Sequence, residues 1–179
     1  MTARRPTLFP LLLTGLLAAA CATLDPAEAY REGQTLRFRG AGVSAPARLP
    51  GCGTVRILTR DDPVDGVAVY RCGRGVTLSI WTRSIGWRDP ADAFENARAL
   101  LPGAWASSQV AAKPGVVTLA GRPMAVRWVI HKDRSHLWLT PDGPAPKVVL
   151  EVAWRGENPV AQAESERAMA ALLDVVQIP

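Results

Sequence analysis

The chain begins with an apolar run and then changes character. Residues 8–20 are almost wholly apolar, follow Arg4 and Arg5, and end in consecutive alanines at 18–20. A positive start, a short apolar segment and small residues at its end are typical of a secretory signal peptide. The run is shorter than the ~18 apolar residues of a membrane-spanning helix. We therefore predict a signal peptide over residues 1–20 and export of the rest of the chain.

Beyond residue 50, short segments alternate between apolar and polar positions, as half-buried strands do. The segments predicted as strands are 55–59, 67–71, 76–82, 105–111, 116–120, 124–131, 136–140 and 148–154. Residues 21–50 contain prolines, glycines and charges without clear periodicity, which predicts a tether and an irregular lead-in. Within that lead-in, only 35–39 alternates enough to form a short strand.

Two segments have the spacing of amphipathic helices. Asp89 is a good N-cap, a proline follows at the first helical position, and an apolar stripe runs through 90–101. Asn158 and another proline open a second stripe over 159–176. Strands, a helix, more strands and a closing helix predict one α+β domain over residues 51–179. Its antiparallel sheet carries two main helices packed on it, because the apolar stripes need a large partner.

Cys21 directly follows the small residues that end the leader. Segment 17–21 reads Leu-Ala-Ala-Ala-Cys and resembles the lipobox of bacterial lipoproteins, with Ala18 where leucine is commonest. The resemblance implies lipidation of the Cys21 sulfur and amino group. Because Ala22 rather than aspartate follows, it also implies anchoring in the outer membrane, on the periplasmic side. The alternatives are a free periplasmic protein, cut after the leader alanines or after 27–29, and an uncleaved anchor.

The other two cysteines, Cys52 and Cys72, form an even pair in an exported chain, which predicts a disulfide. If the two lie opposite each other, the antiparallel register places Val55 opposite Val69 in a stapled N-terminal hairpin. Closing a loop of about 20 residues contributes on the order of 3 kcal/mol to stability. Their spacing fits neither a zinc site nor a C-x-x-C redox motif.

The pattern from Val76 to the C-terminus resembles the PsbP-like and DcrB-like group of small α+β domains. The shared features are a strand and early helix (76–101), a hairpin around 117–125, further strands, and a closing helix that includes 166–176. The resemblance implies a PsbP-like fold and an accessory or binding role, often in an exported lipoprotein. It implies no catalytic residue, and the stapled hairpin lies outside it.

The two histidines of the chain, His131 and His136, flank the polar segment 132–135. A turn there sets His131 opposite His136 on the outer face of a hairpin, within reach of one metal ion. Glu151 is a third ligand if its strand lies alongside. The alternative is a polar hairpin tip with solvated histidines. No nucleophile-elbow, zinc-protease or phosphate-loop motif occurs, so we assign no catalytic residue and no cofactor.

Six tryptophans are many for a domain of this size. Alternation places Trp128 and Trp154 among aliphatic residues, which predicts that both lie in the core. Other tryptophans fall off the apolar faces and lie near arginines, which predicts a surface for a glycan, lipid headgroup or protein segment. The residues of this predicted surface are Trp81, Trp87, Trp138, Arg83, Arg88 and Arg127. Alternatively, these tryptophans cover the edges of a small sheet.

Composition and charge exclude several classes of protein. The chain has 179 residues, 48% of them hydrophobic and 21% charged, which excludes a disordered or collagen-like protein. A net charge of +5, partly from the leader, is too weak for a nucleic-acid footprint. We therefore expect a non-catalytic, lipid-anchored accessory or binding protein, held to the membrane by its acyl chains, with another envelope protein as its partner. A small-ligand or glycan binder, and a metal site or hydrolase at the two histidines, are the alternatives.

Overall fold

The computed structural model describes residues 29–59, 65–99, 108–110, 115–156 and 159–179. The predictions for the leader, Cys21, Trp105 and the Asn158 cap lie outside these residues. In the described ranges, no helix has both the length and the apolar character needed to cross a membrane.

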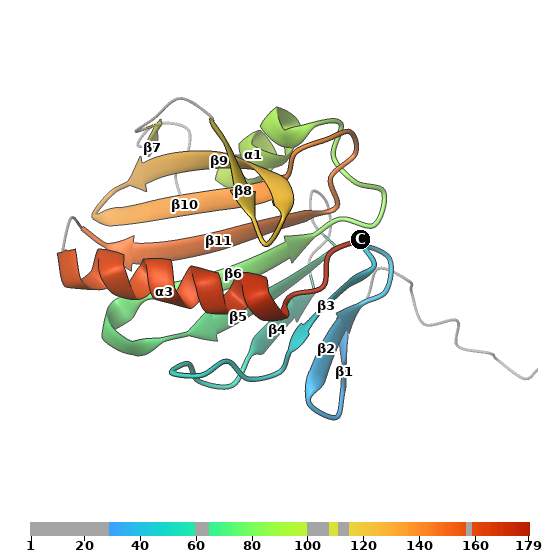
Figure 1. Cartoon of the computed structure of the whole chain (residues 1–179), viewed down its shortest axis with the longest axis horizontal. Coiled ribbons are helices and arrows are strands. Elements are labelled where there is room, and N and C mark those ends of the chain that lie inside the picture. Colours follow the sequence, from blue (N-terminus) through green and yellow to red (C-terminus); the bar gives the residue numbers. More distant parts are fainter. Residues whose placement is uncertain (1–28, 60–64, 100–107, 111–114, 157–158) are drawn as a thin grey trace, which may run out of the picture.

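The main sheet is antiparallel throughout and has the spatial order β4-β5-β6-β11-β10-β9-β7, with β8 pairing to β9 (Figure 1). Its strands are β4 (Arg56–Thr59), β5 (Gly66–Arg71), β6 (Thr77–Thr82), β7 (Ser108–Val110), β8 (Gly115–Leu119), β9 (Arg122–His131), β10 (Arg134–Pro141) and β11 (Val148–Arg155). The helices are α1 (Pro90–Ala99) and α3 (Pro159–Val175), with a short 3-10 turn η1 (Gly73–Gly75) after β5. The predicted α+β class is confirmed.

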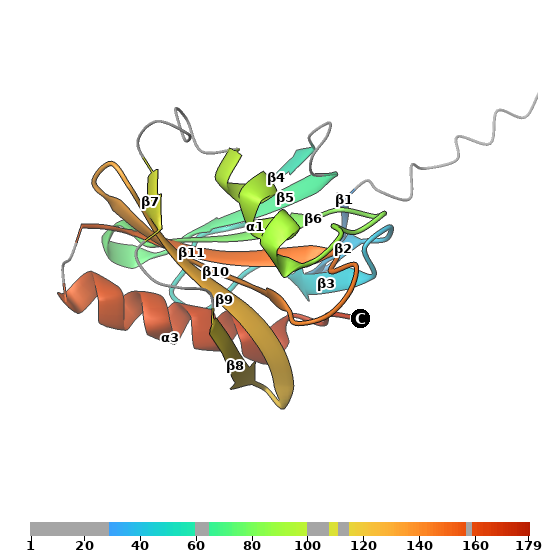
Figure 2. The ribbon, with the colours of Figure 1, turned by 90° about the horizontal axis from the view of Figure 1, so that it is seen from above.

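The two helices lie on opposite faces of this sheet (Figure 2). On what we call the α3 face, α3 packs over β6 and β11 above a largely aliphatic core that includes Leu78, Ile80 and Leu150. On the α1 face, α1 packs over β10 and β11 above a separate, more aromatic core. The buried residues of the α1-face core are Val67, Trp81, Trp87, Ala93, Phe94, Ala97, Ala125, Val129, Trp138 and Val149.

The chain from residue 29 forms a small sheet of β1 (Ala29–Glu32), β2 (Thr35–Phe38) and β3 (Val43–Pro46), in that order. The prediction of an irregular lead-in is therefore wrong for this part, although the strand at 35–39 is confirmed. The strands are too short for alternation to reveal them, but their apolar side chains are buried in the α3-face core. The Tyr70 hydroxyl of β5 donates to the Pro46 carbonyl at 2.6 Å. Burial raises the pKa of Tyr70 to about 12, so this donor stays protonated.

Cys52 and Cys72 form the predicted disulfide and face each other across an antiparallel bridge. The register predicted beyond them is wrong by one residue, because Arg56 rather than Val55 lies opposite Val69. The Val55 N–H donates to the Ala47 carbonyl at 3.2 Å instead of joining the β4–β5 ladder. One extra residue therefore separates the disulfide from β4, as in a bulge.

The hairpin that carries the histidines is tighter than predicted. Lys132 and Asp133 alone form its turn, so His131 lies opposite Arg134 and His136 lies opposite Val129. Lys132 takes the positive φ of 55° that such a turn needs. The predicted pairing is wrong by two residues, and a shift of two keeps every side chain on its predicted face.

Candidate functional site

A row of polar side chains crosses the α1 face of the sheet from strand to strand. Arg127 of β9 lies opposite Trp138 of β10, which lies opposite Glu151 of β11, which lies opposite Ser79 of β6. All four residues are buried. Side chains directly opposite each other in an antiparallel sheet are close neighbours, so the register brings together groups that are far apart in the sequence.

Glu151 is a buried carboxylate held by its neighbours in this row. Its Oε1 lies 2.8 Å from His136 Nδ1 and accepts a hydrogen bond from Trp138 Nε1 at 3.0 Å. Burial alone would raise the pKa of Glu151, but the hydrogen bond and charge of His136, with bonds from Trp138 and Ser79, outweigh it. The net effect lowers the pKa of Glu151 below its ordinary value, so the carboxylate stays ionised at neutral pH.

Both histidines are also interior, at 5% exposure each, with ring centroids 6.4 Å apart. The predicted outer hairpin tip with solvated histidines is therefore wrong, because α1 covers the face on which they lie. β11 does lie alongside β10, as a third metal ligand from Glu151 required. Its carboxylate instead binds His136 Nδ1, and no group of three or more His, Cys, Asp or Glu in the described ranges is placed to hold a metal ion.

The tryptophans expected at a surface lie in the interior as well. Trp81, Trp87 and Trp138 are 7%, 1% and 0% exposed, and Trp138 stacks on Phe94 of α1 with ring centroids 6.4 Å apart. They neither line an open surface nor cover sheet edges, because all three belong to the buried α1-face core, Trp87 from the chain that leads into α1. Trp128 and Trp154, predicted as core residues, make an edge-to-face pair on the α3 face, with centroids 5.5 Å apart.

The three arginines of the predicted surface lie in different environments. Arg88 is exposed and forms an ion pair with Asp89 at 3.1 Å, while Arg83 is half-buried. Arg127 is buried, and its guanidinium lies 5.2 Å from the centroid of the Phe94 ring. The structure therefore does not bring the six residues together on one surface, and it keeps only Arg127 near a candidate site.

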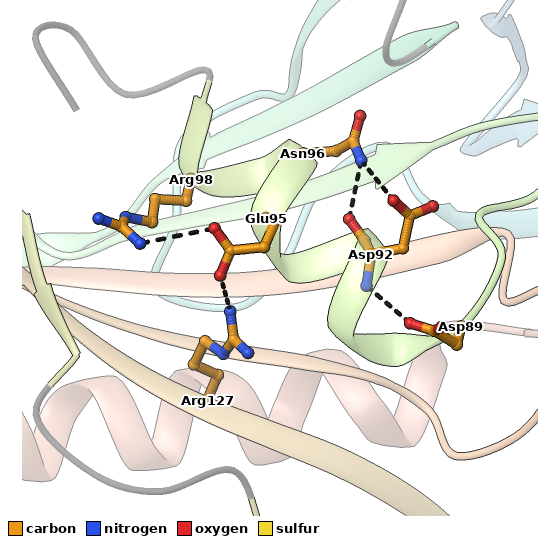
Figure 3. Close-up of polar contacts among 6 residues, drawn as sticks. All are labelled: Asp89, Asp92, Glu95, Asn96, Arg98 and Arg127. Atoms are coloured by element: carbon orange, nitrogen blue, oxygen red, sulfur yellow. Dashed lines mark hydrogen bonds and ion pairs between the residues drawn. The ribbon is translucent and has the colours of Figure 1, made fainter. Parts of the chain in front are cut away.

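Helix α1 is fixed to the sheet by polar contacts (Figure 3). Asp89 Oδ1 accepts the Asp92 N–H at 2.8 Å, which confirms the predicted N-cap. Glu95 lies between two arginines, with Oε1 on Arg127 Nη1 at 2.5 Å and Oε2 near Arg98 Nη1 at 3.5 Å. Because Arg127 belongs to β9, the Glu95–Arg127 ion pair ties α1 to the edge half of the sheet.

The candidate site is a groove of about 380 Å³ between α1 and the β8–β9 hairpin, which we call the α1–β8 groove. Its walls are largely apolar, Arg127 contributes the cation, and two aspartates add carboxylates. The lining residues are Asp89, Pro90, Ala91, Phe94, Gly115, Val116, Ala125, Arg127 and Asp142. Arg127 Nε is buried and has no hydrogen-bond acceptor among the described residues. This arrangement can hold an apolar group that carries a hydrogen-bond acceptor.

The sequence predictions missed this groove. Of its lining residues, only Arg127 belonged to the predicted surface. The available signal was the pair Val116–Val117, in which consecutive apolar residues place one valine on each face of a strand. That signal could not reveal which helix stands beside Val116.

Comparisons with known proteins assign no family to the chain. No protein-family model and no curated protein matches the sequence. Among solved structures, the chain is similar to the solution structure of cyanobacterial PsbP (CyanoP) from Synechocystis sp. PCC 6803. The identity is 10%, the match covers 90% of this chain and 99% of that one, and the TM-score is 0.49. A likeness at this level transfers no function and no residue role, and the α+β class rests on the elements described above.

Proposed function

We propose that the protein is a non-catalytic accessory or binding protein of the bacterial cell envelope, anchored by acyl chains on Cys21 at the periplasmic side of the outer membrane. The observation that carries the proposal is the apolar leader whose closing alanines are followed at once by Cys21. Each buried acyl methylene adds about 0.8 kcal/mol to membrane affinity, so several chains anchor firmly.

The fold supports a position close to the membrane. The first strand begins at Ala29, so the anchor would be joined to the domain by few residues rather than by the long tether expected from the sequence. A fully extended chain from Cys21 to Ala29 spans at most roughly 30 Å. The anchored domain would therefore meet partners at or near the membrane surface.

Accessibility supports a binding role over a catalytic one. His131, His136 and Glu151, the groups best suited to acid–base chemistry, are all buried on the α1 face. At 5% exposure each they are poorly placed to meet a substrate, whereas the α1–β8 groove is open to a partner. A second candidate function is binding of a small apolar molecule in the same groove. It is favoured by Arg127 Nε, which is buried and has no hydrogen-bond acceptor among the described residues.

Fractionation of cells that produce the full chain tests the anchor. We expect the protein in the membrane fraction, with mass spectrometry showing acylated Cys21 at the new N-terminus. Cys21→Ser should move it out of that fraction as an unacylated chain. An unacylated native protein in the soluble periplasmic fraction would overturn the anchoring proposal.

Cross-linked pull-down from the detergent-solubilised envelope tests the binding role. Ala91→Arg places a long cation in the groove at an exposed helical position, and Ile85→Arg is the matched control at an exposed site outside it. We expect a stoichiometric envelope protein with the native chain and Ile85→Arg, and its loss with Ala91→Arg. An empty pull-down would overturn the accessory role, and thermal-shift screening of small apolar acids would then test the second candidate.

A further inference from the structure

Strand β8 is exposed to an unusual degree. Residues 115–118 are all exposed, with Val116 at 58% and Val117 at 40%, although these valines point to opposite faces. Figure 2 shows the β8–β9 hairpin projecting from the body of the molecule. Among the described strands, β8 pairs only with β9, so its other edge is left without a partner strand.

The position of Pro123 shows which backbone groups of β8 point outward from that edge. Thr118 lies opposite Pro123, which has no N–H to donate, so the Thr118–Pro123 pair is not a hydrogen-bonded one. Pairs alternate along an antiparallel ladder. Val117 therefore bonds to Met124 within the hairpin, while the N–H and C=O of Val116 and Thr118 point outward.

The turn of the hairpin supports this assignment. Ala120 and Gly121 have φ of 48° and 74°, the signature of a two-residue type I′ turn, whose flanking residues form a hydrogen-bonded pair. That pair is Leu119 and Arg122, one step from the Thr118–Pro123 pair. Turn and proline therefore give the same alternation.

We propose that the outer edge of β8 pairs with β8 of a second copy of this chain. In an antiparallel arrangement with Val117 on the twofold axis, Val116 of each copy lies opposite Thr118 of the other. These are the residues whose backbone groups point outward, so each pair exchanges two hydrogen bonds. The two sheets would continue across the axis.

Charge favours a second copy over other occupants. A twofold contact places two identical strands against each other, so a net charge on the strand would be repelled by the same net charge on its copy. Residues 115–119 read Gly-Val-Val-Thr-Leu and carry no charge, although the chain as a whole has a net charge of +5. The strand also lacks the lysines, prolines and inward charges with which natural edge strands avoid pairing. Five residues a side make a small interface, which predicts a reversible dimer.

Disulfide cross-linking in cells that produce the full chain tests the proposal. Residues facing each other in a pair without hydrogen bonds have Cα atoms ~4.5 Å apart, within disulfide range. Val117→Cys should therefore give a dimer on oxidation, with mass spectrometry joining residue 117 of two copies. The unsubstituted chain gives the background, and Ile85→Cys, at a 75% exposed site, is the control for random collision.

A second substitution separates pairing from folding. Thr118→Pro removes an outward N–H that the protomer does not use, and proline is tolerated at such an edge position. Added to Val117→Cys, it should abolish the dimer without changing the unfolding midpoint, whereas Thr118→Val should retain the dimer. A dimer no stronger than with Ile85→Cys, a dimer that survives Thr118→Pro, or a disulfide to a different protein would overturn the proposal.

Discussion

The two faces of the main sheet are both interior, but they are built from different residues. On β6 and β11, the α3 face receives Leu78, Ile80 and Leu150, whereas the α1 face receives Trp81 and Glu151. The first face is a largely aliphatic core with few aromatic rings, and the second combines a higher share of aromatic rings with a buried carboxylate, a histidine and an arginine. A mixed polar and aromatic face is thus no guide to exposure, because a helix can cover it.

The largest loss of stability is expected for a substitution among the aromatic rings of the α1 face. Trp138→Ala removes a fully buried ring and the donor to Glu151, and should lower the free energy of unfolding by about 3–5 kcal/mol. Urea unfolding followed by circular dichroism measures it. If Trp138 were at a surface, the loss would be within about 0.5 kcal/mol, and this result would contradict the burial of the α1 face.

Leu150→Ala is the matching test on the α3 face. Leu150 is fully buried beneath α3, and its truncation leaves a cavity that should cost about 2–5 kcal/mol in the same urea experiment. A loss well below about 2 kcal/mol would mean that the α3 face is loosely packed, contrary to the structure.

Both substitutions depend on which face of the sheet a helix covers, and the sequence alone does not show this. Alternation and capping residues predicted the strands from 55 onward, the two helices and the Asp89 cap, and cysteine pairing predicted the disulfide. Alternation shows which residues share a face, but it does not show which face a helix covers. The stripe over 90–101 fits either face, so the sequence alone places the two histidines and Trp81, Trp87 and Trp138 at a surface.

Register and short strands were beyond the sequence for other reasons. A turn of two or of four residues fits the segment between His131 and His136, and both keep the same faces, so hydrophobicity does not choose between them. The β4 register depends on a backbone bond from Val55 to Ala47, which no pattern encodes. The α1–β8 groove arises from the meeting of a helix and an edge hairpin, which only the tertiary structure brings together.

Glu151→Gln tests the polar contacts of the α1 face, and a smaller loss of stability is expected than for the two core variants. It removes the charge from hydrogen bonds to His136 and Trp138, which should cost about 1.5–3 kcal/mol at pH 7. A double-mutant cycle with His136→Ala checks that the loss comes from this contact. Additive effects of the two substitutions would contradict the pairing.

The same variant carries a pH signature. The pKa of Glu151 is lower in the folded state, so its contribution is present above the ordinary glutamate value of 4.5 and is lost as pH falls through the folded pKa. The stability difference between the native chain and Glu151→Gln should therefore shrink as the pH is lowered below about 4. A constant difference between pH 3 and pH 7 would show that this carboxylate does not gain from its surroundings.

The smallest expected effect is at the start of α1. Asp89→Ala removes the side chain that accepts the Asp92 N–H and should lower the unfolding midpoint less than either core variant does. Asp174→Ala, at an exposed position near the end of α3, is the control and should leave the midpoint unchanged. Equal effects would mean that the Asp89 side chain does not stabilise α1 as its cap.

Hydroxyl-radical footprinting of the native protein, read residue by residue by mass spectrometry, tests most directly whether the α1 face is an interior. The account predicts that Trp81, Trp87 and Trp138 are protected until the protein unfolds, while the exposed Ile85 is oxidised in the native state. Rapid oxidation of Trp138 in the native protein would contradict it, and would return the tryptophans and Arg127 to the surface that the sequence suggested.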